Sequence, residues 1–534
     1  MFRSTESRWL PSVLRLVVWV GVVGGLALPV RAQQPERFDV LIRNGRLLDG
    51  TGNPWYLADV AVRDGRIVAV GSLRGATATR VVDAAGRYVA PGFIDVHSHA
   101  AGGLARPELS GARQLLAQGV TTVVVNPDGG GPTDLVMQRA ELSRHGLGVN
   151  VALLVPHNTL RGEVVGQDAR DATPAEMDRM KAVVRAGMDA GAFGLSSGPY
   201  YAPSSFAKTE EFVELAKVVA EYGGVYTSHI RDERDRLIEA VDELIQVAEE
   251  AKLIGIVTHI KSAIPAFGLS EAASRRIESA RDRGVQIFAD QYPYEATSTS
   301  LAANVLPRWV VEGGRERMLA RLRNPDTLAR IREAAAAGVA RLGGADKMQF
   351  SRVAFDPSIE GLTLAQAATK HGKPAEVVVT DLIERGSPQL VYFVMDEDDI
   401  ANFMRRPWVM TSSDGGLVAP GEGRPHPRGN GTFPRKIHRY VKERRVIDLP
   451  TAIRSMTSLP ATVMHLTDRG VIRPGAIADV VVFDLDRIRD RATYLDPHQL
   501  AEGMETILVA GKLALDSGRW TDGKFGEVLS MTRR

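Results

Sequence analysis

The sequence predicts an α/β fold, a TIM-type (β/α)8 barrel accompanied by a small β-sandwich that both ends of the chain build. Apolar, β-branched runs alternate with amphipathic segments through the middle of the chain, which is typical of parallel strands joined by helices. Both ends instead carry short alternating runs separated by tight turns. A length of 534 residues suits one large barrel with a smaller satellite domain.

The overall composition excludes several classes of function. With 66 basic and 64 acidic residues the net charge is +2, and no basic stripe indicates a nucleic-acid partner. The chain has no cysteine, which excludes thiol nucleophiles, thiolate metal ligands and disulfides. A hydrophobic content of 44% supplies ample material for a core.

The first 32 residues have the pattern of a secretory signal peptide. Arg3, Arg8 and Arg15 precede an uncharged run at 16–30, and Val30-Arg31-Ala32 offers a cleavage site. The run is shorter than the roughly 18 residues expected of a membrane-spanning helix. We therefore expect cleavage after residue 32, export to the periplasm or the exterior, and no stable membrane insertion afterwards. The alternative is a retained membrane anchor.

Residues 33–91 and 459–534 are predicted to form the β-sandwich. In the first segment, Asn44-Gly45 and Asp64-Gly65 lie between alternating apolar runs, and such dipeptides are strong hairpin signals. The second segment contains similar short apolar runs at 480–483 and 507–510, which are also separated by turn residues. The chain between them, residues 92–458, is predicted to form the barrel.

Nine apolar runs are candidates for the eight barrel strands. They are 93–96, 121–125, 149–155, 193–195, 225–226, 254–257, 285–288, 391–394 and 408–410. A charged, Ala/Arg-rich and helical stretch near 308–359 interrupts the alternation, and we interpret it as an insertion. One of the nine runs therefore lies outside the barrel.

Histidine and aspartate residues follow several of these predicted strands. His97 and His99 come at the end of the first one, and residues two apart in an extended chain point to the same face. Active sites of such barrels lie at the carboxyl ends of the strands. The other polar residues at predicted strand ends are Asp128, Tyr201, His229, His259, Asp290 and Asp414. For any one histidine the alternative is a structural role, but the whole set predicts a site for a metal ion or for proton transfer.

These motifs resemble those of the zinc-dependent D-aminoacylases (N-acyl-D-amino-acid deacylases) of the amidohydrolase superfamily. The resemblance covers essentially the whole mature length and rests on residues 91–99, 119–124, 228–231, 258–261, 291–294, 413–415, 426–435, 457–460 and 475–483. His-x-His with a distal Asp is typical of the superfamily, whereas the tract 426–435 is closer to this one family. The resemblance implies a metal-dependent hydrolase barrel that converts N-acyl-D-amino acids to a carboxylate and a free D-amino acid.

The resemblance also implies a set of metal ligands. One tight zinc is held by His229, His259 and a third ligand, while His97 and His99 hold a second metal that is weaker or absent. The third ligand in that family is typically cysteine, and Asp128 occupies that position here. A carboxylate also ligates zinc. The alternative is that Asp128 only forms part of a Pro-Asp-Gly turn.

Further roles follow from the same resemblance. Asp414 is the general base that takes a proton from a zinc-activated water. Four residues are expected to face the free carboxylate of the substrate, and these are Tyr201, Lys261, Ser298 and Arg428. From its composition, the Gly/Pro-rich loop 415–431 is expected to close over the substrate, and the alternative is an ordinary exposed loop with solvated charges.

Two other functions stay open from the sequence alone. The first is a related amidohydrolase that acts on cyclic amides or dipeptides, although the fourth predicted strand lacks the lysine that binuclear relatives often carry there. The second is a catalytically dead binding protein, against which the four histidines and Asp414 argue. The expected partner is a small N-acyl amino acid. The sequence leaves open the acyl chain, the side chain, the strictness for D over L, the number of metals and the oligomeric state.

Overall fold

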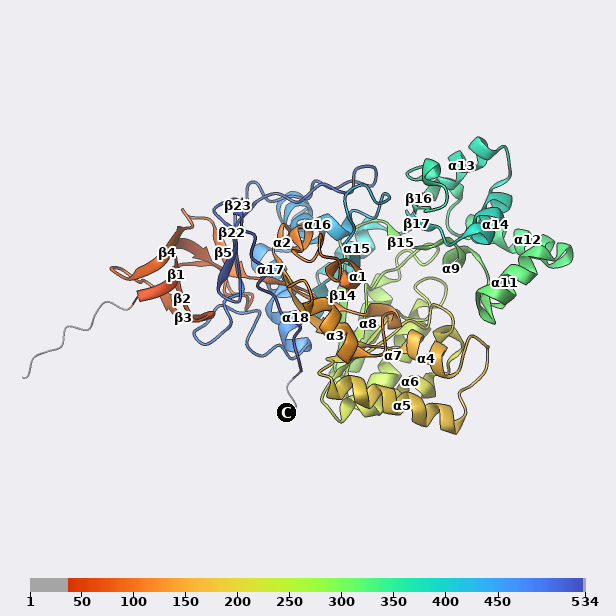
Figure 1. Ribbon diagram of the computed structural model, residues 1–534, viewed down its shortest axis with the longest axis horizontal. Coiled ribbons are helices and arrows are strands. Elements are labelled where there is room, and N and C mark those ends of the chain that lie inside the picture. Colours follow the sequence, from red (N-terminus) through yellow and green to blue (C-terminus); the bar gives the residue numbers. More distant parts are fainter. Residues whose placement is uncertain (1–36, 532–534) are drawn as a thin grey trace, which may run out of the picture. The chain divides into compact units, whose positions relative to one another are not determined.

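Parallel strands form a closed barrel in the middle of the chain, and one large sheet unites the two chain ends (Figure 1). The computed structural model describes residues 37–531, and the predicted signal peptide lies outside them. Among these described residues no helix is both long and apolar enough to cross a membrane.

The barrel has eight strand positions within residues 37–531. In order they are β6 (Phe93–Asp95), β8 (Val120–Val125), β9 (Asn150–Leu153) continued by β10 (Val155–Pro156), β11 (Gly194–Ser197), β12 (Val225–Ser228), β13 (Ile254–Val257), β14 (Ile287–Gln291) and β18 (Val409–Thr411). All pairings between neighbours are parallel. The ring closes where β19 (Gly415–Gly416), just after β18, pairs in parallel with β7 (Ser98–His99), just after β6. The predicted barrel is therefore confirmed.

The two faces of the barrel strands pack into different hydrophobic clusters. Ile94, Val124 and Met410 belong to one cluster, whereas their neighbours Val123 and Val409 belong to another. This alternation is expected of a barrel whose interior is filled by side chains and whose exterior is covered by helices.

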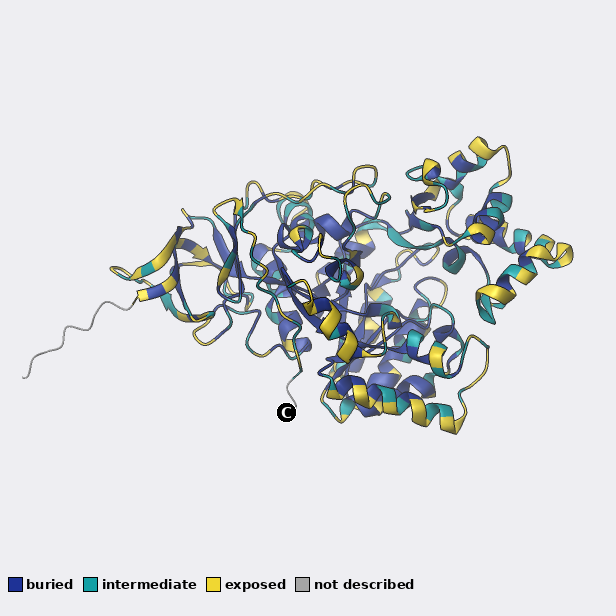
Figure 2. Cartoon of the chain, viewed as in Figure 1, coloured by how far each residue is buried: buried dark blue, intermediate teal, exposed yellow. Residues whose placement is uncertain are grey.

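Amphipathic helices cover the outside of the barrel. The main ones are α3 (Leu135–Ser143), α5 (Pro174–Asp189), α6 (Thr209–Ala220), α7 (Leu237–Ala251), α8 (Ser270–Asp282), α15 (Glu397–Met404) and α17 (Leu449–Met456). α5 begins with a capping box, in which Thr173 and Glu176 each satisfy the other's backbone N–H. α7 buries Leu237, Val241 and Leu244, which are spaced at three and four residues along one face. Figure 2 shows the exposed residues along the outer side of α5.

The large sheet joins residues from both chain ends. Its order is β23 (Arg519–Trp520), β22 (Lys512–Asp516), β21 (Met504–Val509), β20 (Val480–Phe483), β5 (Tyr88–Pro91), β1 (Arg37–Leu47), β2 (Tyr56–Arg63) and β3 (Arg66–Gly71), with β4 (Thr77–Asp83) paired to β1. The two ends meet where β5 runs antiparallel to β20.

One of the two predicted hairpin turns is wrong. Asp64-Gly65 does connect β2 to β3. Asn44-Gly45 instead lies inside β1, where the register shifts between Ile42 and Gly45. A Cβ on Gly45 would lie 2.4 Å from Cγ2 of Val89, so glycine serves a close packing contact at a bulge rather than a turn.

The ninth candidate strand belongs to the insertion. β15 (Thr297–Ser300), β16 (Met348–Arg352) and β17 (Gln389–Tyr392) form an antiparallel sheet, so the run at 391–394 is not a barrel strand. Helices complete this unit, and they are α9 (Leu301–Val305), α10 (Arg308–Val311), α11 (Gly314–Arg323), α12 (Pro325–Arg341), α13 (Leu364–His371) and α14 (Ala375–Arg385). The insertion is thus longer on both sides than the predicted 308–359, because its sheet needs strands from before and after that stretch. It has a hydrophobic core of its own.

Candidate metal and catalytic site

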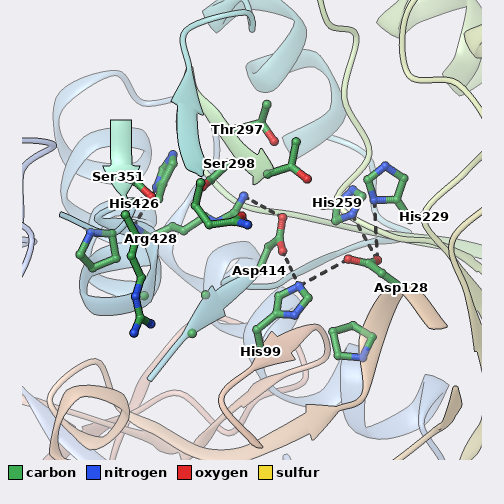
Figure 3. A pocket seen from close by; sticks show the side chains of 18 of the residues that line it. His99, Asp128, His229, His259, Thr297, Ser298, Ser351, Asp414, His426 and Arg428 are labelled. Atoms are coloured by element: carbon green, nitrogen blue, oxygen red, sulfur yellow. Dashed lines mark hydrogen bonds and ion pairs between the residues drawn. The ribbon is translucent and has the colours of Figure 1, made fainter. Parts of the chain in front are cut away.

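The predicted site residues meet at the carboxyl ends of the barrel strands (Figure 3). His97 follows β6, and Asp128 lies in η1 (Pro127–Gly129), the 3-10 turn after β8. His229 follows β12 directly, while His259 and Asp414 lie just after β13 and β18. Parallel strands end on the same rim of a barrel, which brings side chains from across the sequence into one place.

Asp128 lies at the centre of the cluster of histidines. Its Oδ1 lies 3.4 Å from Nε2 of His97, 3.5 Å from Nε2 of His259 and 3.8 Å from Nδ1 of His229. Its other oxygen, Oδ2, lies 3.4 Å from Nε2 of His99. Asp128 therefore contacts both the paired histidines and the two lone ones.

Two groups of possible metal ligands share this aspartate. One consists of His97, His99, Asp128 and Asp414, and the other of Asp128, His229 and His259. Within each group all ligand atoms lie within 4.8 Å of one another. Each group could hold a cation, and Asp128 would be a ligand in both.

Unsatisfied polar atoms show that these residues suit a cation. Nε2 of His97, Oδ1 of Asp128 and both ring nitrogens of His229 are buried and make no hydrogen bond within the described part of the chain. Buried polar atoms normally have a partner. Four nitrogen and oxygen atoms bound to zinc at about 2.0–2.2 Å lie about 3.4 Å apart in a tetrahedral site, close to the separations seen here. The donor set therefore fits a zinc-like ion.

The backbone at these positions is in an unfavourable conformation. Asp128, His259 and Asp414 have φ of 55°, 35° and 48°, in the left-handed region that residues other than glycine seldom adopt. Such strain persists where the surrounding structure enforces it, and it concentrates at functional sites.

Buried carboxylates beneath the rim hold two of these residues in place. Asp290, which lies in β14, accepts hydrogen bonds from the backbone N–H of His259 at 2.8 Å and from Oγ of Ser412. Asp95 accepts from the N–H of Ser413 at 2.8 Å, next to Asp414. Burial raises the pKa of Asp95 to about 6 against the opposing effect of these hydrogen bonds. Asp290, one of the polar strand-end residues, thus supports the site rather than facing the ligand cluster.

Asp414 is held between histidines and an arginine. Its Oδ1 lies 3.1 Å from Nε2 of His99 and 3.5 Å from Nε2 of His97. Its Oδ2 lies 2.7 Å from Nη1 of Arg428. Burial alone would raise the pKa of Asp414, but Arg428 and the neighbouring histidines hold that pKa well below its ordinary value. Asp414 is therefore a carboxylate at neutral pH.

A close approach of two backbone segments brings Arg428 to this position. Arg428 is the first residue of α16 (Arg428–Arg435), and α16 lies against β19. A Cβ added to Gly415 would lie 2.5 Å from Cα of Gly429, so only glycine allows the approach.

Lys261 is paired with a residue that the sequence reasoning missed. Its Nζ donates to Oε1 of Glu233 and lies 2.7 Å from Nδ1 of His259. The same Oε1 lies 3.0 Å from Nδ1 of His259 and 3.7 Å from Nε2 of His229. The position of Glu233, four residues after His229, was the available signal, since the second nitrogen of a ligating histidine commonly meets a carboxylate.

Tyr201 and Ser298 lie on the wall of the same pocket. The hydroxyl of Tyr201 lies 3.1 Å from Oγ1 of Thr299, and the Tyr201 ring contacts that of His229 at 4.8 Å between centroids. Oγ of Ser298 donates to the carbonyl of Leu390 at 2.9 Å. The pocket measures about 490 Å³, and the predicted metal, catalytic and substrate-binding residues line it, with the exception of the buried His97.

Known proteins of one family are similar to this chain over most of its length. Residues 80–514 match the Amidohydrolase family. The chain is 34% identical over 499 residues to the N-acyl-D-glutamate deacylase of Alcaligenes xylosoxydans xylosoxydans, covering 89% of this chain and 93% of the relative. It is 32% identical over 523 residues to the D-aminoacylase of the same organism, covering 93% and 98%. A similar solved structure is the N-acyl-D-glutamate deacylase from Bordetella bronchiseptica, complexed with zinc and a phosphonate inhibitor that mimics the tetrahedral intermediate. It has a TM-score of 0.80 and 34% identity, covering 93% of this chain and 100% of that one.

Proposed function

This chain belongs to the amidohydrolase family, and we propose that it hydrolyses the amide bond of N-acyl-D-amino acids to give a carboxylate and a free D-amino acid. The observation that carries the proposal is the convergence of Asp128, His229 and His259 with Asp414 at one rim of the barrel, beside a pocket of about 490 Å³. That combination of a metal site, a carboxylate base and room for a small substrate fits amide hydrolysis.

We assign one tight zinc to Asp128, His229 and His259, and a second, weaker metal position to His97 and His99. The unpartnered ring nitrogens of His229 and the 3.4–3.8 Å separations around Oδ1 of Asp128 support this assignment. Zinc bound there would lower the pKa of water and stabilise negative charge on a carbonyl oxygen.

Asp414 acts first as general base and then as general acid. Its low pKa keeps it ionised, and Oδ1 faces the paired histidines while Oδ2 faces Arg428. Water attacks the amide carbonyl carbon as Oδ1 takes its proton. The C–N bond then breaks, and Asp414 returns the proton to the leaving amine nitrogen, which restores the carboxylate.

Tyr201, Lys261, Ser298 and Arg428 bind the free carboxylate of the substrate. Arg428 is the main cation, because its guanidinium can meet a carboxylate with two hydrogen bonds, whereas Lys261 offers a point charge. A substrate carboxylate near Arg428 competes with Oδ2 of Asp414 for the guanidinium. Binding then weakens the ion pair and makes Asp414 a stronger base at the moment when a base is needed.

The N-terminal pattern leads us to propose that the enzyme works after export, in the periplasm or outside the cell. The cleavage site proposed after Ala32 supports this location. Cell fractionation of the full chain tests the proposal, and activity found only in the cytoplasm would contradict it.

Hydrolysis assays test the proposed activity. We expect the metal-loaded protein to release free amino acid from N-acetyl-D-amino acids faster than from the L-enantiomers, and to lose this activity on chelation. Zinc should restore it. A metal-loaded protein that opens only cyclic amides, or that hydrolyses nothing, would overturn the proposal.

A further inference from the structure

A second buried arginine lines the substrate pocket besides Arg428, and it makes no ion pair with a carboxylate of the described residues. Arg234 lies in the loop after β12, is only 7% exposed, and lines the pocket together with Tyr200 and Asn304. Within residues 37–531, no ion pair joins its guanidinium to a carboxylate. The other two buried cations of the pocket differ, since Lys261 pairs with Glu233 and Arg428 with Asp414.

Arg234, Tyr200 and Asn304 form a closed hydrogen-bonded triangle. Nη1 of Arg234 donates to the hydroxyl of Tyr200 at 2.7 Å, and Nη2 donates to Oδ1 of Asn304 at 2.6 Å. The hydroxyl of Tyr200 donates to the same Oδ1 at 2.6 Å. Because Oδ1 accepts from both partners, the orientation of the Asn304 amide is set.

The acceptor atoms used within the triangle accept hydrogen bonds from its own members, whereas two of its donor groups have no partner. Nε of Arg234 and Nδ2 of Asn304 are buried and make no hydrogen bond within the described part of the chain. A guanidinium has no acceptor, and an amide nitrogen donates only. A group that completes the cluster must therefore accept hydrogen bonds, and a negative charge would balance the guanidinium.

The guanidinium of Arg234 is buried and has only neutral direct partners, although the more distant carboxylates Glu233 and Asp232 raise its pKa against the effect of burial. Burying a charge whose direct partners are neutral costs free energy, because water no longer solvates it and more distant counter-charges replace the water only in part. The cation persists on the wall of a pocket whose contents exchange with solvent. An anionic part of the substrate is the partner that this geometry suits.

The triangle and Arg428 contact different members of the metal cluster. The Tyr200 ring is 5.0 Å from the His229 ring, whereas Arg428 contacts Asp414. Asn304 lies in α9, directly after the strand β15 that carries Ser298. Two sites for negative charge are therefore present in one pocket, and an ordinary N-acyl amino acid fills only one of them with its α-carboxylate.

We propose that Arg234, Asn304 and Tyr200 bind a second carboxylate of the substrate, so that the enzyme prefers N-acyl-D-amino acids with two carboxylates. The proposal rests on the proposed function. The second carboxylate can come from an acidic amino-acid side chain or from a dicarboxylic acyl group. Both present the same chemistry to a guanidinium, which binds carboxylates in a fork geometry.

Matched substrate pairs test this proposal. N-acetyl-D-glutamate against N-acetyl-D-glutamine changes the charge of the side chain at nearly constant shape. N-succinyl-D-leucine against N-butanoyl-D-leucine changes the charge of the acyl group. We expect kcat/KM to favour the charged member of one pair by about tenfold or more, the size expected of a charge-assisted hydrogen bond. The pair that responds identifies the source of the carboxylate.

Variants assign the preference to the triangle. Arg234→Gln should bring the charged-to-neutral ratio of kcat/KM close to one, and Arg234→Lys should restore part of it because the charge returns without the fork. Arg236→Gln is the matched control, since Arg236 lies two residues away, is exposed and does not line the pocket. It should keep the wild-type ratio.

The outcomes separate this proposal from the proposed function. Hydrolysis of both members of each pair at equal efficiency by the wild type would overturn the second-carboxylate site and leave the deacylase activity standing. This outcome is measured on the wild type alone, so it does not depend on whether a variant folds. A preference that survives in folded Arg234→Gln would also overturn the assignment to Arg234. Failure to hydrolyse any member would overturn the proposed function and this proposal with it.

Discussion

Nη1 of Arg428 lies 2.7 Å from Oδ2 of Asp414. The sequence assigned these two residues separate roles, one in recognition of the substrate carboxylate and the other in proton transfer. Their contact means that a change at Arg428 acts on the substrate and on the base together. Mutations at this pair therefore need substrates that separate the two effects.

Arg428→Lys should lower kcat/KM on N-acyl amino acids by about ten- to a hundredfold, because a forked contact worth roughly 1.5–3 kcal/mol becomes a point contact. The loss on the corresponding amino-acid amides should be smaller but measurable, since these substrates lack the carboxylate while Asp414 still loses its partner. Kinetics on matched acids and amides measure both. Equal losses would show that Arg428 acts only through Asp414.

Asp414→Asn should keep the fold and lose at least about two orders of magnitude in kcat, the size of a general-base contribution. The amide preserves the shape of the side chain but accepts no proton at neutral pH. Turnover and circular dichroism of the purified variant check the two parts. Near-normal turnover would mean that another group takes the proton.

His259→Ala should abolish the tight zinc, because it removes one of three ligands. Elemental analysis after dialysis should give about one zinc per chain in the wild type, the usual content of a catalytic site with three protein ligands. His97→Ala is the control, and it should retain that ion because His97 belongs to the other ligand group. Full zinc content in His259→Ala would contradict the assignment.

Lys436 should make stability depend on pH in the alkaline range. It is buried, its Nζ donates to Oγ1 of Thr411 at 2.8 Å and to Oγ of Ser455 at 2.9 Å, and burial lowers its pKa to about 7. In the unfolded chain its pKa is about 10.4, so between about pH 7 and pH 10 the unfolded state binds a proton that the folded state does not.

The free energy of unfolding should therefore rise with pH across this window as far as Lys436 contributes. Lys436→Met should remove that contribution. The gain in the free energy of unfolding of the variant over the wild type should therefore be larger at pH 7 than at pH 9.5. Urea denaturation of the wild type and the variant at both values gives the difference, in which other titrating groups cancel. A difference in stability that is independent of pH would show that Lys436 titrates normally.

Features that depend on neighbouring residues could be predicted from the sequence. The alternation of apolar runs with amphipathic segments predicts the barrel, because each period of hydrophobicity is a local property. The metal-type residues could be located because they directly follow strands, and strand ends in a parallel barrel share one rim. The Asp64-Gly65 turn followed in the same way from the conformational preference of two adjacent residues.

Long-range packing determined the features of the fold and the site that the sequence did not predict. Asn44-Gly45 has the composition of a turn, but it forms a bulge in which Gly45 packs closely against Val89. The run at 391–394 pairs with strands of the insertion and is therefore not a barrel strand. Long-range packing also determines the ion pairs. Arg428 meets Asp414 because Gly415 and Gly429 allow two backbone segments to touch. Arg234 reaches Asn304 across 70 residues of sequence. A sequence shows which residues carry charge, but burial and distance determine which charges are balanced, and those come only with the tertiary structure.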